Sequence, residues 1–314
     1  MRKSQPVIAI LGPTAVGKTR ISIPLAERFE GEIVSVDSRL IYRGMDIGTA
    51  KPTLEERERV THHLIDVTDP DDTWNLAKYS DAALNVIHDI HGRGKVAFLV
   101  GGTGQYLRAI LEGWTPPPSA ESPRLREKLE AIAANEGYDA LYRQLQEVDP
   151  ASAERIDPRN VRRVVRALEV FETTGKPASS QREKNPPSFE ILRIGLTLPR
   201  SELYQRLDQR IDLMIEAGWI EEVQVLIASG ISPGLPSLSA IGYDQLAAYL
   251  CGEMDLDSAI VEIRRLSRQF VRRQGNWFKA EDPEIQWFEA VSGVEEQISA
   301  VIKRWLSGSA QAGH

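Results

Sequence analysis

Short apolar runs alternate with longer helix-like stretches over the first hundred residues. Val7–Leu11, Glu32–Asp37 (EIVSVD) and Lys95–Val100 (KVAFLV) have the length and composition of strands buried in a parallel sheet. Residues 18–29 and 75–91 are predicted helices between them. Strand, helix and strand with a glycine-rich first turn predict an α/β fold with a doubly wound parallel sheet.

One position disturbs the first of these helices. Pro24 falls well inside residues 18–29, and an interior proline costs about 3 kcal/mol or bends a helix. We therefore expect a kink or an early break at Pro24.

The pattern changes after Trp114. TPPPSAESP (115–123) has the composition of a linker, residues 124–147 and 159–175 are predicted helices, and GKPASSQREKNPPS (175–188) is again polar and proline-containing. FEILRIGLTL (189–198) is a predicted return strand, and residues 201–275 are mostly helical. The simplest arrangement is a P-loop α/β core made of residues 1–114 and 188–314, with a helical insertion domain at 115–187.

Composition narrows the class of protein. The 314 residues are 42% hydrophobic and 26% charged, as in an ordinary soluble globular protein, and no run of about 18 apolar residues predicts a membrane span. The N-terminal apolar stretch runs straight into a glycine loop, unlike a secretory signal. Cys251 is the single cysteine, which excludes an internal disulfide and a cysteine-based zinc site. We expect a cytoplasmic protein with no membrane partner.

The charge is unevenly distributed. The net charge is −7, yet Arg264–Lys279 contains six basic residues and no acidic one, and Arg155–Arg166 contains five arginines. The negative net charge argues mildly against nucleic-acid binding, but an acidic protein with two concentrated basic tracts can still bind a polyanion locally.

The strongest chemical signal is LGPTAVGKT, residues 11–19. Gly12, Gly17, Lys18 and Thr19 satisfy the spacing of a phosphate-binding loop, in which backbone N–H groups and the lysine cradle phosphates and the threonine hydroxyl can ligate Mg²⁺. An ATPase of this type normally has an acid after a second apolar strand, but KVAFLV runs into GGTG. The other candidate acid is Asp37, as a metal ligand or as a general base.

Further motifs give the chain a family resemblance. GPTAVGKT (12–19), DSRLIYRGMDIGTAKP (37–52), HHLID (62–66), GGTGQY (101–106), RALEVF (166–171), SAIGYDQL (239–246) and RQFVRRQGNWF (268–278) occur in order over nearly the whole chain. Together they closely resemble the bacterial tRNA dimethylallyltransferases, the tRNA isopentenyltransferase family. The resemblance implies transfer of a prenyl group from dimethylallyl diphosphate to the exocyclic amine of the adenine immediately 3′ of the tRNA anticodon, with Mg²⁺ as cofactor.

The resemblance also implies roles for single residues. Asp37 would take the proton of the adenine amine, with metal ligation or capping of the next turn as the alternative. Thr103 would lie near the reaction centre, with a plain turn residue as the alternative. Arg206 and Arg210 lie four apart on one helical face, and we expect Arg210 to contact the diphosphate. Arg206 in that role is the alternative, as is a solvated surface charge for either arginine. The expected diphosphate contacts in the loop are Gly12, Thr14, Ala15, Val16, Gly17, Lys18 and Thr19, and Thr19 is also the expected metal ligand.

The tRNA anticodon stem-loop is the expected macromolecular partner. A stacked adenine must be flipped out to react, and RNA loops are read by splayed bases, stacking and edge hydrogen bonds. The insertion would contact the anticodon arm. By resemblance the tRNA-binding residues are Ser38, Arg39, Leu40, Arg162, Arg163, Arg166, Ile241, Gly242, Tyr243, Arg268, Gln269 and Arg273. A solvated surface charge is the alternative for any single arginine.

Two other functions remain open at this stage, and we expect a monomer. A small-molecule or nucleotide kinase would use Asp37 to activate a hydroxyl, and ATP turnover would reveal it. A non-catalytic RNA-binding protein with a relict loop is the second, although the intact Lys18, Thr19 and Asp37 count against it.

Overall fold

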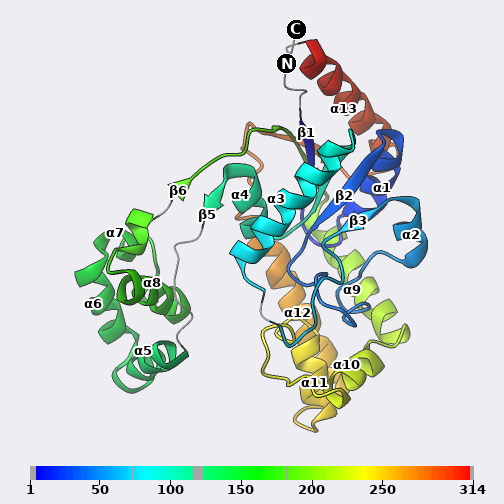
Figure 1. The fold of residues 1–314 in the computed structure, drawn as a ribbon. Coiled ribbons are helices and arrows are strands. Elements are labelled where there is room, and N and C mark those ends of the chain that lie inside the picture. The colour runs from blue at the N-terminus through cyan, green and yellow to red at the C-terminus, as the bar shows by residue number, and fades with distance from the viewer. Residues whose placement is uncertain (1–4, 73, 116–122, 182, 312–314) are drawn as a thin grey trace. The chain divides into compact units, whose positions relative to one another are not determined.

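The chain divides into two compact units in a computed structural model. The structure describes residues 5–72, 74–115, 123–181 and 183–311 (Figure 1). One unit comprises Met1–Leu111 and Pro187–His314, and the other comprises Glu112–Pro186. Most of the predicted linker, residues 116–122, lies outside the described residues.

A parallel sheet forms the centre of the larger unit. Among the described residues it has six strands in the order β3-β2-β4-β1-β7-β8, and every pairing is parallel. The strands are β1 (Pro6–Leu11), β2 (Gly31–Val36), β3 (His62–His63), β4 (Val96–Gly101), β7 (Glu190–Thr197) and β8 (Ile285–Glu289). The predicted α/β class is thereby confirmed, and β3 and β8 are strands that the sequence pattern did not predict.

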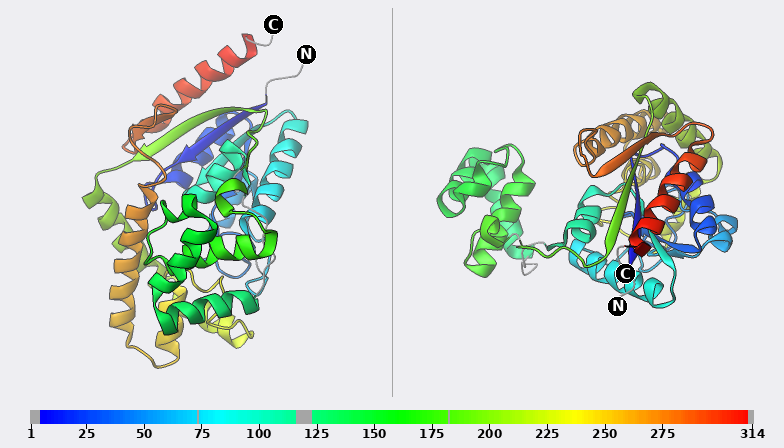
Figure 2. Two further views of the ribbon diagram at one scale, coloured as in Figure 1. Left: turned by 90° about the vertical axis from the view of Figure 1, so that its left-hand side faces the viewer. Right: turned by 90° about the horizontal axis from the view of Figure 1, so that it is seen from above.

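Helices cover both faces of this sheet. The helices of the larger unit in the described part of the chain are α1 (Lys18–Arg28), α2 (Leu54–Arg59), α3 (Leu76–Gly92), α4 (Gly104–Glu112), α9 (Arg200–Glu216), α10 (Trp219–Ala228), α11 (Tyr243–Leu250), α12 (Leu256–Gln274) and α13 (Val294–Gln311). α1 packs against α13 over one face, and α3 packs over β2 and β4 from the other (Figure 2). Ile8, Ile10 and Phe98 are completely buried between these layers.

The expected break at Pro24 does not occur. α1 continues through Pro24 to Arg28. Ile21, Ile23 and Leu25, on either side of the proline, are buried in the core. Their burial offsets the hydrogen bond that proline cannot donate, since a buried aliphatic side chain contributes about 1.5–3 kcal/mol.

The strand order brings three loops together. β1, β4 and β2 are neighbours and run the same way, so the phosphate loop, the Gly101–Gly104 turn and Asp37 all leave the same edge of the sheet. Ligands bind at this carboxyl edge in open α/β sheets. Gly101 permits the close approach, because a Cβ there would lie 2.1 Å from the Val36 carbonyl oxygen.

The smaller unit is helical and has a core of its own. It contains β5 (Trp114–Thr115), α5 (Pro123–Glu136), α6 (Tyr138–Val148), α7 (Pro150–Ala153), α8 (Val161–Thr174), the 3₁₀ helix Ala178–Gln181 and β6 (Glu183–Lys184). Leu141, Leu145 and Val164 are completely buried in that core. The single helix expected at 124–147 is wrong: Gly137, at φ 86°, separates α5 from α6 because this backbone conformation ends a helix.

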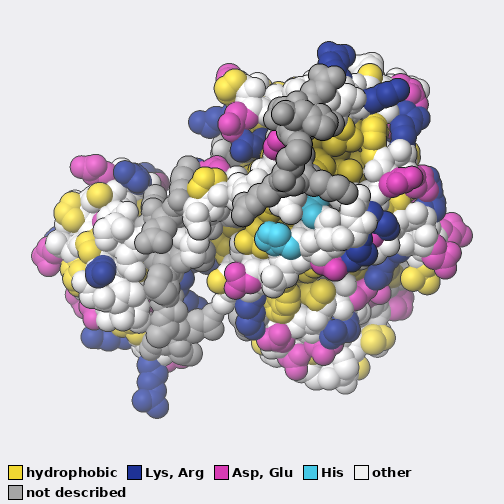
Figure 3. Space-filling view, turned by 45° about the horizontal axis from the view of Figure 1, so that its top comes forward, with side chains coloured by type: hydrophobic (Ala, Val, Ile, Leu, Met, Phe, Trp, Pro, Cys, Tyr) yellow, Lys and Arg dark blue, Asp and Glu magenta, His cyan; other side chains and the backbone are white. Residues whose placement is uncertain are grey.

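Charged side chains of both signs are interspersed over the core unit on the face in Figure 3. That face therefore carries no single large acidic patch among the described residues. No helix in the described part of the chain has both the length and the apolarity needed to cross a membrane.

Candidate active site

The phosphate loop links β1 to α1. Ala15 (φ 67°) and Gly17 (φ 98°) adopt left-handed conformations, which curl the loop ahead of the first helical turn. The Lys18 ammonium donates hydrogen bonds to the carbonyls of Gly12 (3.0 Å) and Pro13 (2.9 Å). Lys18 therefore lies across its own loop, with its charge balanced by carbonyl dipoles rather than by a direct ion pair among the described residues.

Three charged groups converge beside this loop. Burial lowers the pKa of Lys18 from 10.5 to about 8; the nearby Asp37 carboxylate acts to raise it, and Arg210 to lower it further. Burial also lowers the pKa of Arg210, against the opposing influence of Asp37. Two desolvated cations and one carboxylate thus share one electrostatic environment. Such a site favours a multiply charged anion.

Asp37 and Thr103 are held in neighbouring turns. The Arg39 N–H donates to Asp37 Oδ1 at 2.8 Å. The Ser38 N–H donates to the Thr103 hydroxyl oxygen at 3.3 Å, and the Thr103 N–H donates to the Val36 carbonyl at 3.3 Å. Thr103 therefore fixes the chain directly after Asp37, and both side chains remain partly exposed.

The structure distinguishes the two candidate arginines of α9. Arg206 forms an ion pair with Glu202, one turn earlier, at 2.7 Å. Arg210 lies in the field of Asp37 and Lys18 and makes no hydrogen bond or ion pair with any described residue. Arg210 is the guanidinium available to an anion at this site.

Two tyrosines near Asp37 were missed as candidate site residues. Tyr79 and Tyr106 stack with ring centroids 3.9 Å apart, and the Tyr79 hydroxyl donates to the Ser35 carbonyl at 2.8 Å. Burial raises the pKa of Tyr106 to about 12, with Tyr42 and Asp37 contributing. Both phenols therefore stay neutral, and Tyr106 belongs to the GGTGQY motif, which was the available sequence signal.

A cavity of about 440 Å³ opens beside Arg210. Its walls include Ile47, Pro52 and Met214, and two leucines at its edge are unusually exposed: Leu54 at 75% and Leu213 at 63%. Asp46, Lys51 and Arg57 also line the cavity. A cavity with apolar walls and guanidinium groups at its lining suits an anion that carries a hydrocarbon chain.

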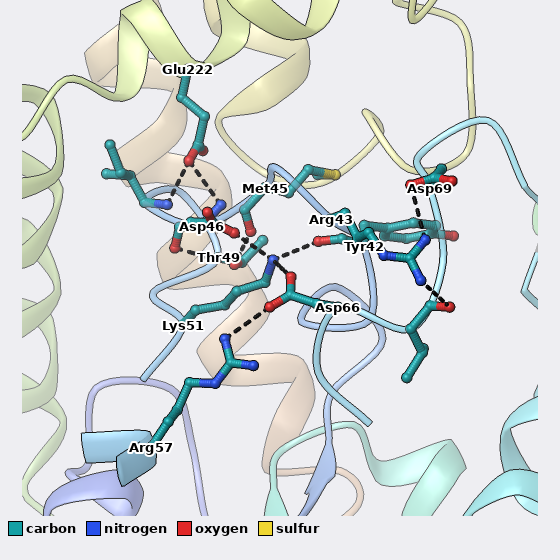
Figure 4. A network of polar contacts seen from close by, with 12 residues as sticks. Tyr42, Arg43, Met45, Asp46, Thr49, Lys51, Arg57, Asp66, Asp69 and Glu222 are labelled. Atoms are coloured by element: carbon teal, nitrogen blue, oxygen red, sulfur yellow. Dashed lines mark hydrogen bonds and ion pairs between the residues drawn. The ribbon is translucent and has the colours of Figure 1, made fainter. Parts of the chain in front are cut away.

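A polar network shapes the loop that lines this cavity (Figure 4). The buried Lys51 ammonium donates to the Tyr42 carbonyl and to the carboxylates of Asp46 and Asp66, each at 2.5 Å. Arg57 donates to the other oxygen of Asp66 at 2.8 Å. Burial alone would raise the pKa of Asp66, but the hydrogen bonds from Lys51 and Arg57 hold it below its usual value. The network holds residues 42–57 together through two cations, Lys51 and Arg57, that share Asp66.

Glu222 joins that loop to the SAIGYDQL motif. Its carboxylate accepts from the N–H groups of Asp46 (2.8 Å) and Ile47 (2.7 Å) and from the Tyr243 hydroxyl (2.6 Å). Burial, reinforced by Glu222, raises the pKa of Tyr243. Gly242 and Tyr243 are buried, Tyr243 completely, so of the predicted tRNA-binding set 241–243 only Ile241 is partly exposed to an outside partner.

The predicted tRNA-binding residues after Asp37 are differently engaged. The Arg39 guanidinium donates to the carbonyls of Pro236 (2.6 Å) and Ser237 (3.0 Å), tying that loop to Ser38. Leu40 lies on the second, smaller cavity beside Thr19. The Arg39 guanidinium is thus engaged by the protein's own backbone. The Ser38 side chain, in contrast, is partly exposed to solvent.

The arginines of the two basic helices also differ. Arg162, Arg163 and Arg166 are exposed on α8, and Arg162 and Arg163 have no ion-pair partner among the described residues. On α12, Arg268 pairs with Asp208 and lies 5.6 Å from the Tyr204 ring centroid, whereas Arg273 lies 5.9 Å from that of Phe270. Gln269 is partly exposed on the same helix. Arg162 and Arg163 on α8 and Arg273 on α12 are therefore exposed without an ion pair among the described residues.

The comparisons with known proteins identify the family. The sequence profile of the IPP transferase family matches residues 40–281, about three quarters of the chain. The chain belongs to the IPP transferase family. The tRNA dimethylallyltransferase of Roseiflexus sp. (strain RS-1) is 50% identical over 301 residues, which are 96% of this chain and 99% of that relative.

Two solved structures of the family resemble this one. The full-length tRNA isopentenylpyrophosphate transferase of Bacillus halodurans is 39% identical with a TM-score of 0.74, covering 99% of both chains. A eukaryotic dimethylallyltransferase described as acting on tRNA is 28% identical with a TM-score of 0.82, covering 98% of this chain and 80% of its own. The predicted family and fold are confirmed.

Proposed function

We propose that the chain transfers the dimethylallyl group of dimethylallyl diphosphate to the exocyclic amine of the adenine immediately 3′ of the anticodon in tRNA. The enzyme class predicted from the sequence is confirmed by the family membership and by relatives near 50% identity over almost their whole length. The observation that carries the site assignment is the convergence of Lys18, Arg210 and Asp37 beside the phosphate loop.

Each group has a part in the reaction. Lys18, Arg210 and the loop N–H groups hold the diphosphate, and they stabilise the charge that grows on it as the allylic C–O bond breaks. The amine attacks the allylic carbon to form the C–N bond, and Asp37 takes the proton that the nitrogen loses. Diphosphate is the leaving group, and the apolar walls of the cavity beside Arg210 accommodate the prenyl chain.

The residues at the phosphate loop fit a Mg²⁺ ion whose ligands come partly from the protein and partly from the substrate diphosphate and water. The Thr19 hydroxyl, in the first turn of α1, makes no hydrogen bond with a described residue, and no group of three or more metal-ligating side chains occurs in the described part of the chain. Mg²⁺ characteristically takes one or two protein ligands, with substrate phosphates and water completing the shell. When bound, it would neutralise diphosphate charge.

The tRNA would dock through basic side chains of both units. Arg162, Arg163 and Arg166 on α8, with Gln269 and Arg273 on α12, would contact the anticodon arm, and Ser38 would face the flipped base. Phosphate contacts of this kind position RNA, while stacking and edge contacts select the base. We propose a monomeric cytoplasmic enzyme.

A label-transfer assay tests this function. Purified protein, Mg²⁺ and radiolabelled dimethylallyl diphosphate are incubated with unmodified tRNA, and a parallel sample contains ATP without the prenyl donor. Label should enter the tRNA without ATP, and a matched tRNA with guanine replacing the target adenine should stay unlabelled. ATP turnover with no labelled tRNA would support the kinase alternative instead.

A further inference from the structure

Gln274, the last residue of α12, is a buried polar side chain that joins two loops of the site. It is only 4% exposed. Its Oε1 accepts a hydrogen bond from the Thr14 N–H at 2.8 Å, and its Nε2 donates to the Gly102 carbonyl at 3.1 Å. One amide thus connects the phosphate loop with the glycine turn that precedes Thr103.

The hydrogen bond from Thr14 to Gln274 occupies one of the backbone N–H groups of the phosphate loop. The Thr14 N–H, expected from the sequence to contact the diphosphate, is already satisfied by Gln274. The loop is therefore held from outside at its second residue after Gly12. This hydrogen bond constrains where the loop can lie, because moving the loop would leave the N–H and the buried amide without their partners.

The last residue of α12 and the turn that follows the helix contact the glycine turn on both sides of Thr103. A Cβ on Gly102 would lie 2.5 Å from Gln274 Nε2, and a Cβ on Gly104 would lie 2.2 Å from Trp277 Cγ. Thr103 in turn accepts from the Ser38 N–H, next to Asp37. These contacts connect the end of α12 with the turn that positions Asp37.

We propose that Gln274 is a positioning residue through which RNA docking on α12 and diphosphate binding in the phosphate loop become energetically coupled. The proposal rests on the proposed function, since that assigns Gln269 and Arg273 of α12 to the tRNA. These residues lie five and one positions before Gln274 on a continuous helix, so an RNA that fixes the helix also fixes the amide. Binding of either substrate then favours binding of the other by the same factor.

Equilibrium binding tests the coupling. The dissociation constant of inorganic diphosphate is measured with Mg²⁺, with and without an anticodon stem-loop RNA, on the full-length protein. We expect the RNA to tighten diphosphate binding by roughly 5-fold or more in the natural protein, the lower end of typical coupling between sites. In Gln274→Met, which keeps the length of the side chain but forms neither hydrogen bond, the ratio should fall to about 1.

A second variant and a control separate positioning from loss of structure. Gln274→Glu keeps the acceptor for the Thr14 N–H but loses the donor to the Gly102 carbonyl. Its charge weakens diphosphate binding with and without RNA alike, so the ratio should lie between about 1 and the value of the natural protein. Gln286→Met, at an exposed glutamine of β8, should leave the ratio unchanged. If Gln274→Met does not fold, the test rests on Gln274→Glu: a ratio below that of the natural protein supports the coupling role, and an unchanged ratio overturns it.

The outcomes distinguish this inference from the proposed function. Natural protein that transfers label to tRNA but shows a ratio of 1, or variants that keep the full ratio, would overturn the coupling role alone. Absence of label transfer by the natural protein would overturn the proposed function itself.

Discussion

At the scale of single residues, Asp37 is the group whose loss should affect the chemical step most. Asp37→Asn preserves the shape and the acceptor for the Arg39 N–H but not the basic carboxylate. We expect kcat to fall by roughly 10²–10⁴-fold, the usual contribution of a general base. Single-turnover label transfer with saturating substrates measures this step.

The control for that prediction is Asp81→Asn, an exposed aspartate of α3, which should transfer label at the natural rate. The stem-loop RNA should bind Asp37→Asn as tightly as the natural protein. Near-normal transfer by Asp37→Asn would remove the general-base role.

Lys18 predicts a pH dependence of diphosphate binding. Burial lowers the pKa of its ammonium in the free protein to about 8, and a bound anion raises that pKa. The favourable charge is therefore fully present well below pH 8 and is lost as pH rises. Affinity should fall about tenfold per pH unit above roughly pH 8, until the pKa of the complex is reached.

Calorimetry of inorganic diphosphate binding between about pH 6 and pH 10 gives this profile. Lys18→Arg should remove the falling limb, because a guanidinium stays protonated throughout that range. Equal dissociation constants at pH 7 and pH 9 in the natural protein would contradict the assignment.

The sequence predicted Lys18, Asp37 and Thr103 as site residues, but it did not single out Gln274 or Tyr106, although both lie within quoted motifs. Lys18, Asp37 and Thr103 occupy fixed places in loops after predicted strands, so their convergence followed from parallel topology. Gln274 lies 260 residues from Thr14, and its partners are a backbone N–H and a carbonyl, which carry no sequence signature. The burial of Tyr243 likewise depends on Glu222, from a different helix.

At the scale of elements, the sequence predicted the longer strands of the parallel sheet and missed its two shortest among the described residues. β1, β2 and β4 were predicted because each is almost wholly buried. β8 was missed because it is an edge strand with only Ile285 buried, and β3 because it has two residues. A short or half-exposed strand lacks the periodicity that distinguishes it from a loop.

α8 is the element whose charge should matter most to RNA binding. Its buried face holds Val164 and Leu168 in the core of the smaller unit, while Arg162 and Arg163 are exposed without carboxylate partners among the described residues. The double variant Arg162→Ala/Arg163→Ala should weaken stem-loop binding and lower the slope of log affinity against log salt by about 1–2, since each lost phosphate contact contributes about 0.7–0.9.

The matched control removes two equal charges elsewhere. Arg28 and Arg59 are ion-paired with Glu296 and Glu27. Arg28→Ala/Arg59→Ala should leave the salt slope unchanged, because neither arginine is assigned to the RNA. Equal slopes for both double variants and the natural protein would show that the α8 arginines are ordinary surface charges.

At the scale of the whole molecule, the smaller unit has its own core and begins and ends at adjacent residues, so we expect that it can be excised from the chain. Trp114 pairs with Lys184 in an antiparallel ladder, and the Asn185 N–H donates to the Gly113 carbonyl at 3.0 Å, so the two ends of the insertion lie side by side. Its core residues pack with one another, and Lys18, Asp37, Thr103 and Arg210 all belong to the larger unit. Excision of the smaller unit should therefore leave binding of the prenyl donor intact and weaken binding of the RNA.

Replacing residues 115–183 by an Asn-Gly turn, which suits a two-residue hairpin between Trp114 and Lys184, tests this separation. We expect the dissociation constant of inorganic diphosphate to stay within about twofold, while stem-loop RNA binds roughly tenfold or more weakly through loss of the α8 phosphate contacts. Cooperative thermal unfolding verifies that the shortened core is folded. Undiminished RNA affinity in a folded variant would assign docking to the larger unit, because α12 would then supply the necessary contacts without α8.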